Sequence, residues 1–153
     1  MRLFKILSLA SFLLVLVSCN KDVDTTVFYS KYAALTPAQV VPAQSGAGTG
    51  SMEYTYTPTT KTLVYTIRWN GITGAPTAIN IRGTASEGFS SATIIQAITG
   101  AASTSGSYSG TLLVDGIVVK EADLLGGKYY VNISTAASTT LGVQGEIRGQ
   151  IKF

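Results

Sequence analysis

Residues 145–151 read Gly-Glu-Ile-Arg-Gly-Gln-Ile and place a carboxylate two residues before a guanidinium. Alternate side chains of a β-strand point to the same face, so we expect Glu146 and Arg148 to lie together and to pair with each other or with a neighbouring strand. A solvent-facing ion pair of this kind contributes only about 0–1 kcal/mol. We therefore interpret the motif as the closing strand of a sheet, with no catalytic role for the pair.

Other chemistry is restricted by composition, because the chain has no histidine and a single cysteine, Cys19. The lack of histidine excludes a Ser-His-Asp triad, a His-Glu-x-x-His zinc helix and histidine-ligated copper or iron. If Cys19 is modified, as argued next, no thiolate remains for nucleophilic attack or for metal binding. We predict no catalytic residues, no metal ligands and no cofactor.

Residues 1–18 have the form of a secretory signal peptide. A basic start, Met-Arg-Leu-Phe-Lys, precedes an apolar run over residues 6–17, which is too short to cross a bilayer comfortably. The run ends in Leu-Val-Ser-Cys, which resembles the bacterial lipobox. The resemblance implies cleavage before Cys19 and lipid attached to its sulfur and its amino group.

Lipid on Cys19 predicts a protein that is anchored on a membrane, since each buried CH₂ contributes about 0.8 kcal/mol. Asn20 follows the cysteine in place of the aspartate that is linked to inner-membrane retention. This favours the bacterial outer membrane, and both the periplasmic and the surface-exposed side are compatible with the sequence. We predict that residues 19–32 form the lipidated cysteine and a flexible tether, and that residues 33–153 form one domain.

The charge balance does not favour a nucleic-acid partner. Without the signal peptide, nine basic residues face eight acidic ones, and no cluster of Lys and Arg remains. Hydrophobic residues make up 46% of the chain and charged residues 12%, a composition typical of a folded domain.

The domain reads as a series of short strands, because runs of alternating polarity rich in Thr, Ser and Tyr are separated by Gly and Pro turns. The clearest runs, residues 51–57 and 62–70, predict a hairpin. We expect further strands over residues 77–82, 91–99, 108–114, 128–135 and 143–153, and one helical turn over 122–125. Trp69 shares its face with Leu63 and Ile67, which favours core packing over sugar stacking. The pattern predicts an all-β, antiparallel β-sandwich.

Several of these segments, taken in order, resemble the CHRD domain, the module repeated in chordin and also found alone in bacterial envelope proteins. The segments are residues 35–42, 48–50, 63–67, 71–72, 78–83, 110–112, 128–135 and 145–151. The resemblance covers nearly all of the mature chain, and its most specific element is Gly-Glu-Ile-Arg-Gly-Gln-Ile after a Tyr-Val-Asn strand. It implies a Greek-key β-sandwich related in topology to Cu/Zn superoxide dismutase, and it implies no known reaction.

The chain departs from this family at positions where many members carry histidine. Asn80-Ile81-Arg82-Gly83 replaces a His-x-His-Gly motif, and Ser134 replaces a further histidine. We expect a polar cluster here that is held by hydrogen bonds and contains no metal. Its predicted members share the polar parity of their strands: Asn80, Arg82, Asn132, Ser134, Glu146 and Arg148.

We conclude from the sequence that the protein is a lipid-anchored envelope protein with a non-enzymatic binding or structural role. Its predicted partners are the membrane, through Cys19, and an unidentified protein or glycan. Two alternatives stay open. One is a hydrolase that acts on envelope glycans through two carboxylates about 5–9.5 Å apart, for example Glu87 and Asp115. The other is a metal-handling protein, which the histidine-bearing members of the family suggest. Separately, Glu121 and Asp123 are acids that an oxygen-ligated calcium site could use.

Overall fold

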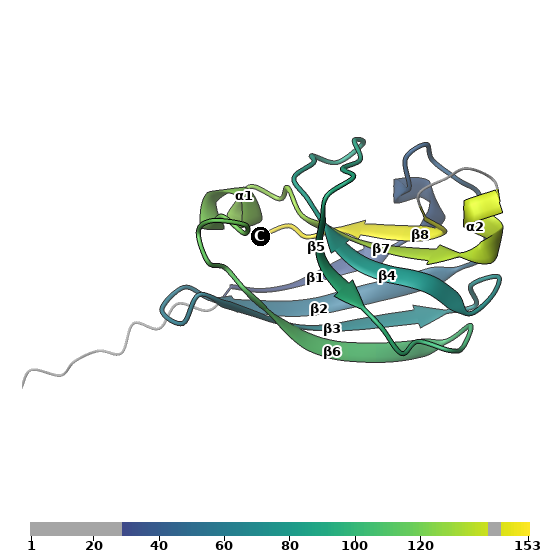
Figure 1. Cartoon of the computed structure of the whole chain (residues 1–153), viewed down its shortest axis with the longest axis horizontal. Coiled ribbons are helices and arrows are strands. Elements are labelled where there is room, and N and C mark those ends of the chain that lie inside the picture. Colours follow the sequence, from purple (N-terminus) through teal and green to yellow (C-terminus); the bar gives the residue numbers. More distant parts are fainter. Residues whose placement is uncertain (1–28, 141–144) are drawn as a thin grey trace, which may run out of the picture.

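The computed structural model describes residues 29–140 and 145–153, in which eight strands form two four-stranded antiparallel sheets packed face to face (Figure 1). Sheet A has the order β1 (Tyr29–Leu35), β2 (Thr49–Thr57), β3 (Thr62–Asn70) and β6 (Gly106–Leu113). Sheet B has the order β5 (Ile94–Ile98), β4 (Pro76–Arg82), β7 (Tyr130–Thr135) and β8 (Ile147–Gln150). Short helices lie in the connections: η1 (Pro37–Gln39), α1 (Glu121–Leu125) and α2 (Ala136–Thr140). The predicted β-sandwich is confirmed.

The chain changes sheet repeatedly, and two strand pairs bring distant segments together. β3 pairs with β6, and β4 pairs with β7. Pairing between strands that are not consecutive in the chain is typical of Greek-key topology. The two sheets also meet at one side, where Thr36 and Arg148 exchange backbone hydrogen bonds of 2.9 and 3.1 Å. This bridge fixes the closing strand β8 beside the segment that follows β1.

The predicted hairpin is confirmed: β2 and β3 pair in continuous register from Thr57–Thr62 to Thr49–Asn70. The strands predicted over 77–82 and 108–114 are present as β4 and β6, with bounds that differ by one or two residues. Those predicted over 91–99, 128–135 and 143–153 are present as β5, β7 and β8 with shorter bounds, and the predicted helical turn is α1. Three elements were not predicted: β1, η1 and α2. Because β1 begins at Tyr29, residues 29–32 belong to the sheet, and their assignment to the tether is wrong. The signal peptide and Cys19 lie outside the described residues.

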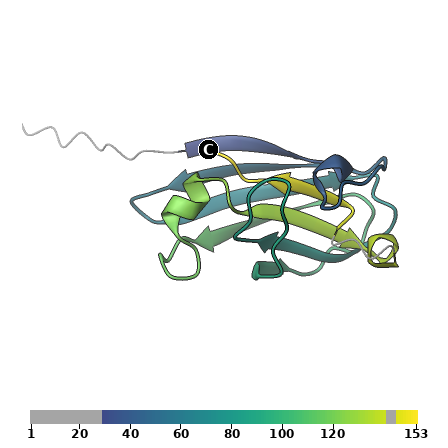
Figure 2. The same ribbon diagram turned by 90° about the horizontal axis from the view of Figure 1, so that it is seen from above.

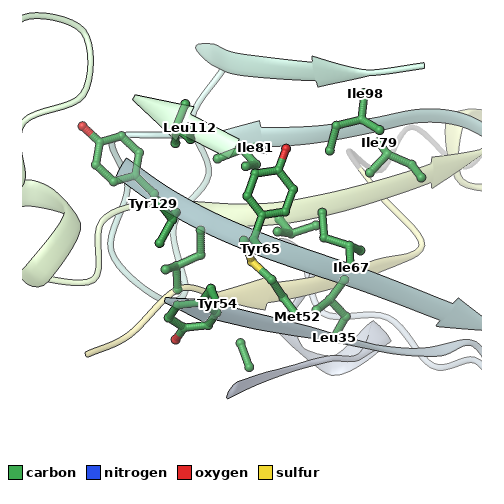
Figure 3. Packing of buried hydrophobic residues seen from close by; sticks show 14 of the residues in the cluster. Leu35, Met52, Tyr54, Tyr65, Ile67, Ile79, Ile81, Ile98, Leu112 and Tyr129 are labelled. Atoms are coloured by element: carbon green, nitrogen blue, oxygen red, sulfur yellow. The ribbon is translucent and has the colours of Figure 1, made fainter. Parts of the chain in front are cut away.

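Between the sheets, side chains of one parity from every strand form a single apolar core (Figure 3). Its largest fully buried members from sheet A include Leu35, Met52, Tyr56, Leu63, Tyr65 and Ile67, and those from sheet B include Ile79, Ile81 and Ile133. Trp69 is 5% exposed and donates its indole N–H to the carbonyl of Ser103 at 3.0 Å. The prediction that it packs in the core is confirmed.

An aromatic cluster joins the start of β1 to the last residue of the chain. The ring of Phe153 meets those of Tyr29, Tyr54 and Tyr56 edge-on, with centroid distances of 6.0, 5.3 and 6.2 Å. The hydroxyl of Tyr54 donates to the carbonyl of Lys152 at 2.6 Å. The first described strand and the chain end therefore lie side by side, as Figure 2 also shows.

Burial of tyrosine hydroxyls predicts sensitivity to alkali. Burial raises the pKa of Tyr54, Tyr65 and Tyr129 above the ordinary 10.0, and it raises that of Tyr56 to about 12, with the Glu121 carboxylate adding to the effect. The folded protein thus holds these protons more tightly than the unfolded chain does. Their contribution to stability is complete below about pH 10 and falls as the pH rises through the folded pKa values.

We therefore expect cooperative unfolding above pH 10, which far-ultraviolet circular dichroism and tyrosinate absorbance would follow together. Ionisation of all the tyrosines near pH 10 with the sheet signal intact would contradict the described core.

Candidate functional site

The predicted polar cluster lies on the outer face of sheet B, the side turned away from the core. Asn80, Asn132 and Arg148 are direct neighbours in one row across β4, β7 and β8. Ser134 accepts a 3.2 Å hydrogen bond from the side-chain amide of Asn132. Arg82 lies one row further along β4 and donates to the carbonyl of Ser91 at 3.2 Å. The register therefore brings together Asn80, Asn132 and Arg148, and Glu146 is the predicted member that bonds elsewhere.

This row is covered by protein. Asn80, Asn132 and Arg148 are each at most 4% exposed. The connection between β4 and β5 folds over the next row, which contains Tyr130 and Gln150. The side-chain amide of Gln150 donates to the carbonyl of Ala85 at 2.9 Å, and the hydroxyl of Tyr130 donates to the carbonyl of Ser91 at 3.1 Å. The two rows together form a buried polar layer.

Arg148 is the charged member of this layer, and its surroundings differ from the predicted solvent-facing pair. Its guanidinium lies 3.8 Å from the ring centroid of Tyr130, and Nη2 donates to Oε1 of Gln150 at 2.7 Å. Nη1 is buried without a hydrogen-bond partner. Burial lowers the pKa of Arg148, which the neighbouring Tyr130 and Glu87 partly oppose. The stacking on Tyr130 and the hydrogen bond to Gln150 are direct compensations for this buried charge.

Glu146 forms no ion pair with Arg148 among the described residues, and it follows the other predicted alternative by bonding to the neighbouring strand β7. Oε1 accepts the backbone N–H of Thr73 at 2.7 Å, and Oε2 accepts the hydroxyls of Thr73 at 2.7 Å and Thr135 at 2.5 Å. The carboxylate thereby ties the loop after β3 to the end of β7. Both oxygens are occupied by these donors, which fits a structural clamp.

The acids considered for hydrolysis have separate partners. Glu87 forms an ion pair with Lys152, and Asp115 accepts three backbone N–H groups in its own loop. Within the described part of the chain, no three His, Cys, Asp or Glu side chains lie close enough together to hold a metal ion.

The outer face of sheet A is open, in contrast to that of sheet B. Hydroxyl side chains form cross-strand pairs over it: Ser30 with Thr55 at 2.7 Å and Thr66 with Ser109 at 2.8 Å. An ion pair of 3.0 Å joins Arg68 to Glu53, whose side chains are 51% and 59% exposed. We call this surface the hydroxyl face; its members are Ser30, Tyr32, Glu53, Thr55, Thr66, Arg68, Ser107 and Ser109.

A shallow hollow at one edge of the hydroxyl face combines an aromatic ring with polar groups. Tyr32, Ser51, Arg68 and Asn70 contribute to its lining. Tyr32 is 62% exposed and lies on β1 opposite Glu53. Tyr32 was not identified as a functional residue from the sequence, because residues 19–32 were assigned to a tether. The other residues of the hydroxyl face on β2 and β3 could have been found from the sequence, because polar residues alternate with apolar ones along both strands.

Comparison with known proteins assigns the chain to a family. The CHRD domain family model matches residues 32–151, which run from within β1 to just beyond β8. Neither the curated proteins nor the solved structures contain a match to the chain. The topological relation to superoxide dismutase therefore stays a prediction. The extent of the family match shows that the chain belongs to the CHRD domain family.

Proposed function

We propose that this CHRD domain protein is a non-enzymatic, lipid-anchored protein of the bacterial outer membrane, and that it binds a glycan on the hydroxyl face. The anchor part rests on the signal-peptide pattern and on Cys19 at its end. No helix among the described residues has the length and apolar character needed to cross a bilayer. The lipid on Cys19 would therefore supply the membrane attachment.

The observation that carries the binding proposal is the open, hydroxyl-rich sheet face with Tyr32 beside the Arg68–Glu53 pair. Hydroxyl, carboxylate and guanidinium groups supply both the donors and the acceptors that a sugar's hydroxyls require. An exposed tyrosine ring offers an apolar platform with a polar tip, on which the C–H face of a sugar ring can stack. The buried row on sheet B offers neither access nor an exposed ring.

The test is a titration of the purified, detergent-solubilised protein with defined envelope glycans, such as peptidoglycan fragments and outer-membrane polysaccharide. We expect Tyr32→Ala to weaken binding at least about tenfold, which corresponds to about 1.4 kcal/mol. Phe89→Ala is the matched control, because it removes another exposed aromatic side chain (69% exposed) from a loop of the other sheet. It should leave the affinity unchanged.

Equal affinities for the two variants, or no binding to any glycan, would contradict the proposed site. A protein partner whose capture requires Tyr32 would replace the glycan as the ligand of this face.

A further inference from the structure

An exposed apolar tip lies at one end of the sandwich, in the connection between β6 and α1. Ile117 is 81% exposed and Val118 is 59% exposed, while Leu113 at the end of β6 is 62% exposed. Adjacent aliphatic side chains this exposed are unfavourable in water, because each leaves a large apolar area hydrated. We call Leu113, Ile117 and Val118 the apolar tip.

The tip is held in a fixed conformation. Oδ1 of Asp115 accepts the backbone N–H groups of Ile117, Val118 and Val119 at 2.9, 2.8 and 2.9 Å. These hydrogen bonds lower the pKa of Asp115, and the bond from the Val119 N–H has the largest effect. The carboxylate therefore stays charged and bonded at neutral pH. Val119 is 2% exposed and fixes the loop to the core. The apolar side chains are therefore presented by an ordered loop.

The strand register places the tip at the end of the sandwich where β1 begins. Tyr29 pairs with Tyr56, Tyr56 with Leu63, and Leu63 with Leu112. The backbone N–H of Val114 then donates to the carbonyl of Lys61 in the β2–β3 turn at 2.8 Å. Figure 1 shows the connection before α1 at this same end.

The sequence limits how far this end can lie from the predicted anchor. Tyr29 follows Cys19 by ten residues, and ten residues span at most about 33–36 Å when fully extended. The end that carries the tip is therefore held within about 36 Å of the bilayer surface if Cys19 is lipidated. Lys61 and Lys120 are exposed beside the loop, but Asp115 and Glu121 offset their charge. Apolar contact, more than charge, would hold the loop on the membrane.

We infer that Ile117 and Val118 insert into the interface of the phospholipid bilayer and so orient the anchored domain. The strands of sheet A would then point away from the membrane, and the hydroxyl face would be accessible from the side. This inference rests on the proposed lipid anchor. It goes beyond that anchor because a lipid on Cys19 fixes the point of attachment and does not by itself fix the orientation of the domain. Burial of even a few apolar side chains at the interface adds to the attachment and fixes its direction.

The test uses full-length protein purified with its lipid and reconstituted in phosphatidylethanolamine–phosphatidylglycerol vesicles. A nitroxide is attached at Ile117→Cys or, separately, at Val118→Cys. The matched control is Ala75→Cys, an exposed position in the loop between β3 and β4 at the opposite end. Mass spectrometry of each sample reports whether Cys19 carries lipid, since an unlipidated Cys19 would take a second nitroxide.

We expect the ratio of collisions with oxygen to collisions with a water-soluble nickel complex to be severalfold higher at positions 117 and 118 than at position 75. Equal ratios at both ends, in protein whose Cys19 is lipidated, would overturn the membrane contact and leave the anchor intact. A doubly labelled protein that does not remain with the vesicles would overturn the anchor and the membrane contact together.

Discussion

Replacement of Gly149 by alanine is expected to destabilise the protein by about 3 kcal/mol, the upper part of the usual range for overpacking. A Cβ atom at this position would lie 2.7 Å from the carbonyl oxygen of Ala34 and 2.7 Å from Cδ1 of Leu35. Leu35 is fully buried, and the adjoining backbone is fixed by the bridge between Thr36 and Arg148. Neither neighbour can move away without loss of packing between β1 and β8.

Urea unfolding followed by circular dichroism measures this effect. Gly74→Ala is the control, because a Cβ atom there would meet no atom within 4 Å. It should unfold at nearly the same urea concentration as the unaltered protein. If the two variants have the same midpoint, β8 does not pack against β1 as the structure describes.

Replacement of Arg148 by alanine is expected to cost about 3 kcal/mol, because it opens a cavity over Tyr130 and removes a buried hydrogen bond to Gln150. Arg148→Met should be at least about 2 kcal/mol more stable than Arg148→Ala. Methionine fills most of the same volume, keeps contact with the Tyr130 ring, and removes a buried charge whose Nη1 has no partner.

Thermal and urea unfolding of both variants separate these contributions. Arg68→Ala provides the comparison, since it removes the same side chain from an exposed ion pair, which is worth about 0–1 kcal/mol. If Arg148→Ala and Arg68→Ala have the same small effect, the position of Arg148 inside a covered polar layer is wrong. If Arg148→Met is as unstable as Arg148→Ala, polar contacts of the guanidinium outweigh its packing.

The alternation of side chains predicts most of the two sheets. Residues 62–70 illustrate why: Leu63, Tyr65, Ile67 and Trp69 are all buried, and the residues between them face outward. β1 was missed for the opposite reason. Only Ala33 and Leu35 are buried among its seven residues, so its sequence carries little alternation. Its place in the sheet depends on pairing with β2, which is a long-range contact.

The candidate site shows a different limit of sequence reasoning. Strand parity correctly grouped Asn80, Asn132 and Arg148 on one face. Parity distinguishes the two faces of a strand, but it does not reveal whether a loop covers the polar one. The partners of Glu146 were also inaccessible from the sequence, because Thr73 lies 73 residues away in the chain. These contacts exist only through the Greek-key connections.

The meeting of Tyr29 and Phe153 in one aromatic cluster has a consequence for modular architecture. A unit whose first strand and final residue emerge beside each other can be spliced into a surface loop of a host protein without opening either sheet. The same geometry suits circular permutation, with new termini placed in an exposed turn such as that between β2 and β3. If copies of the domain were joined in series, the segments that connect them would all lie at the same end of each copy.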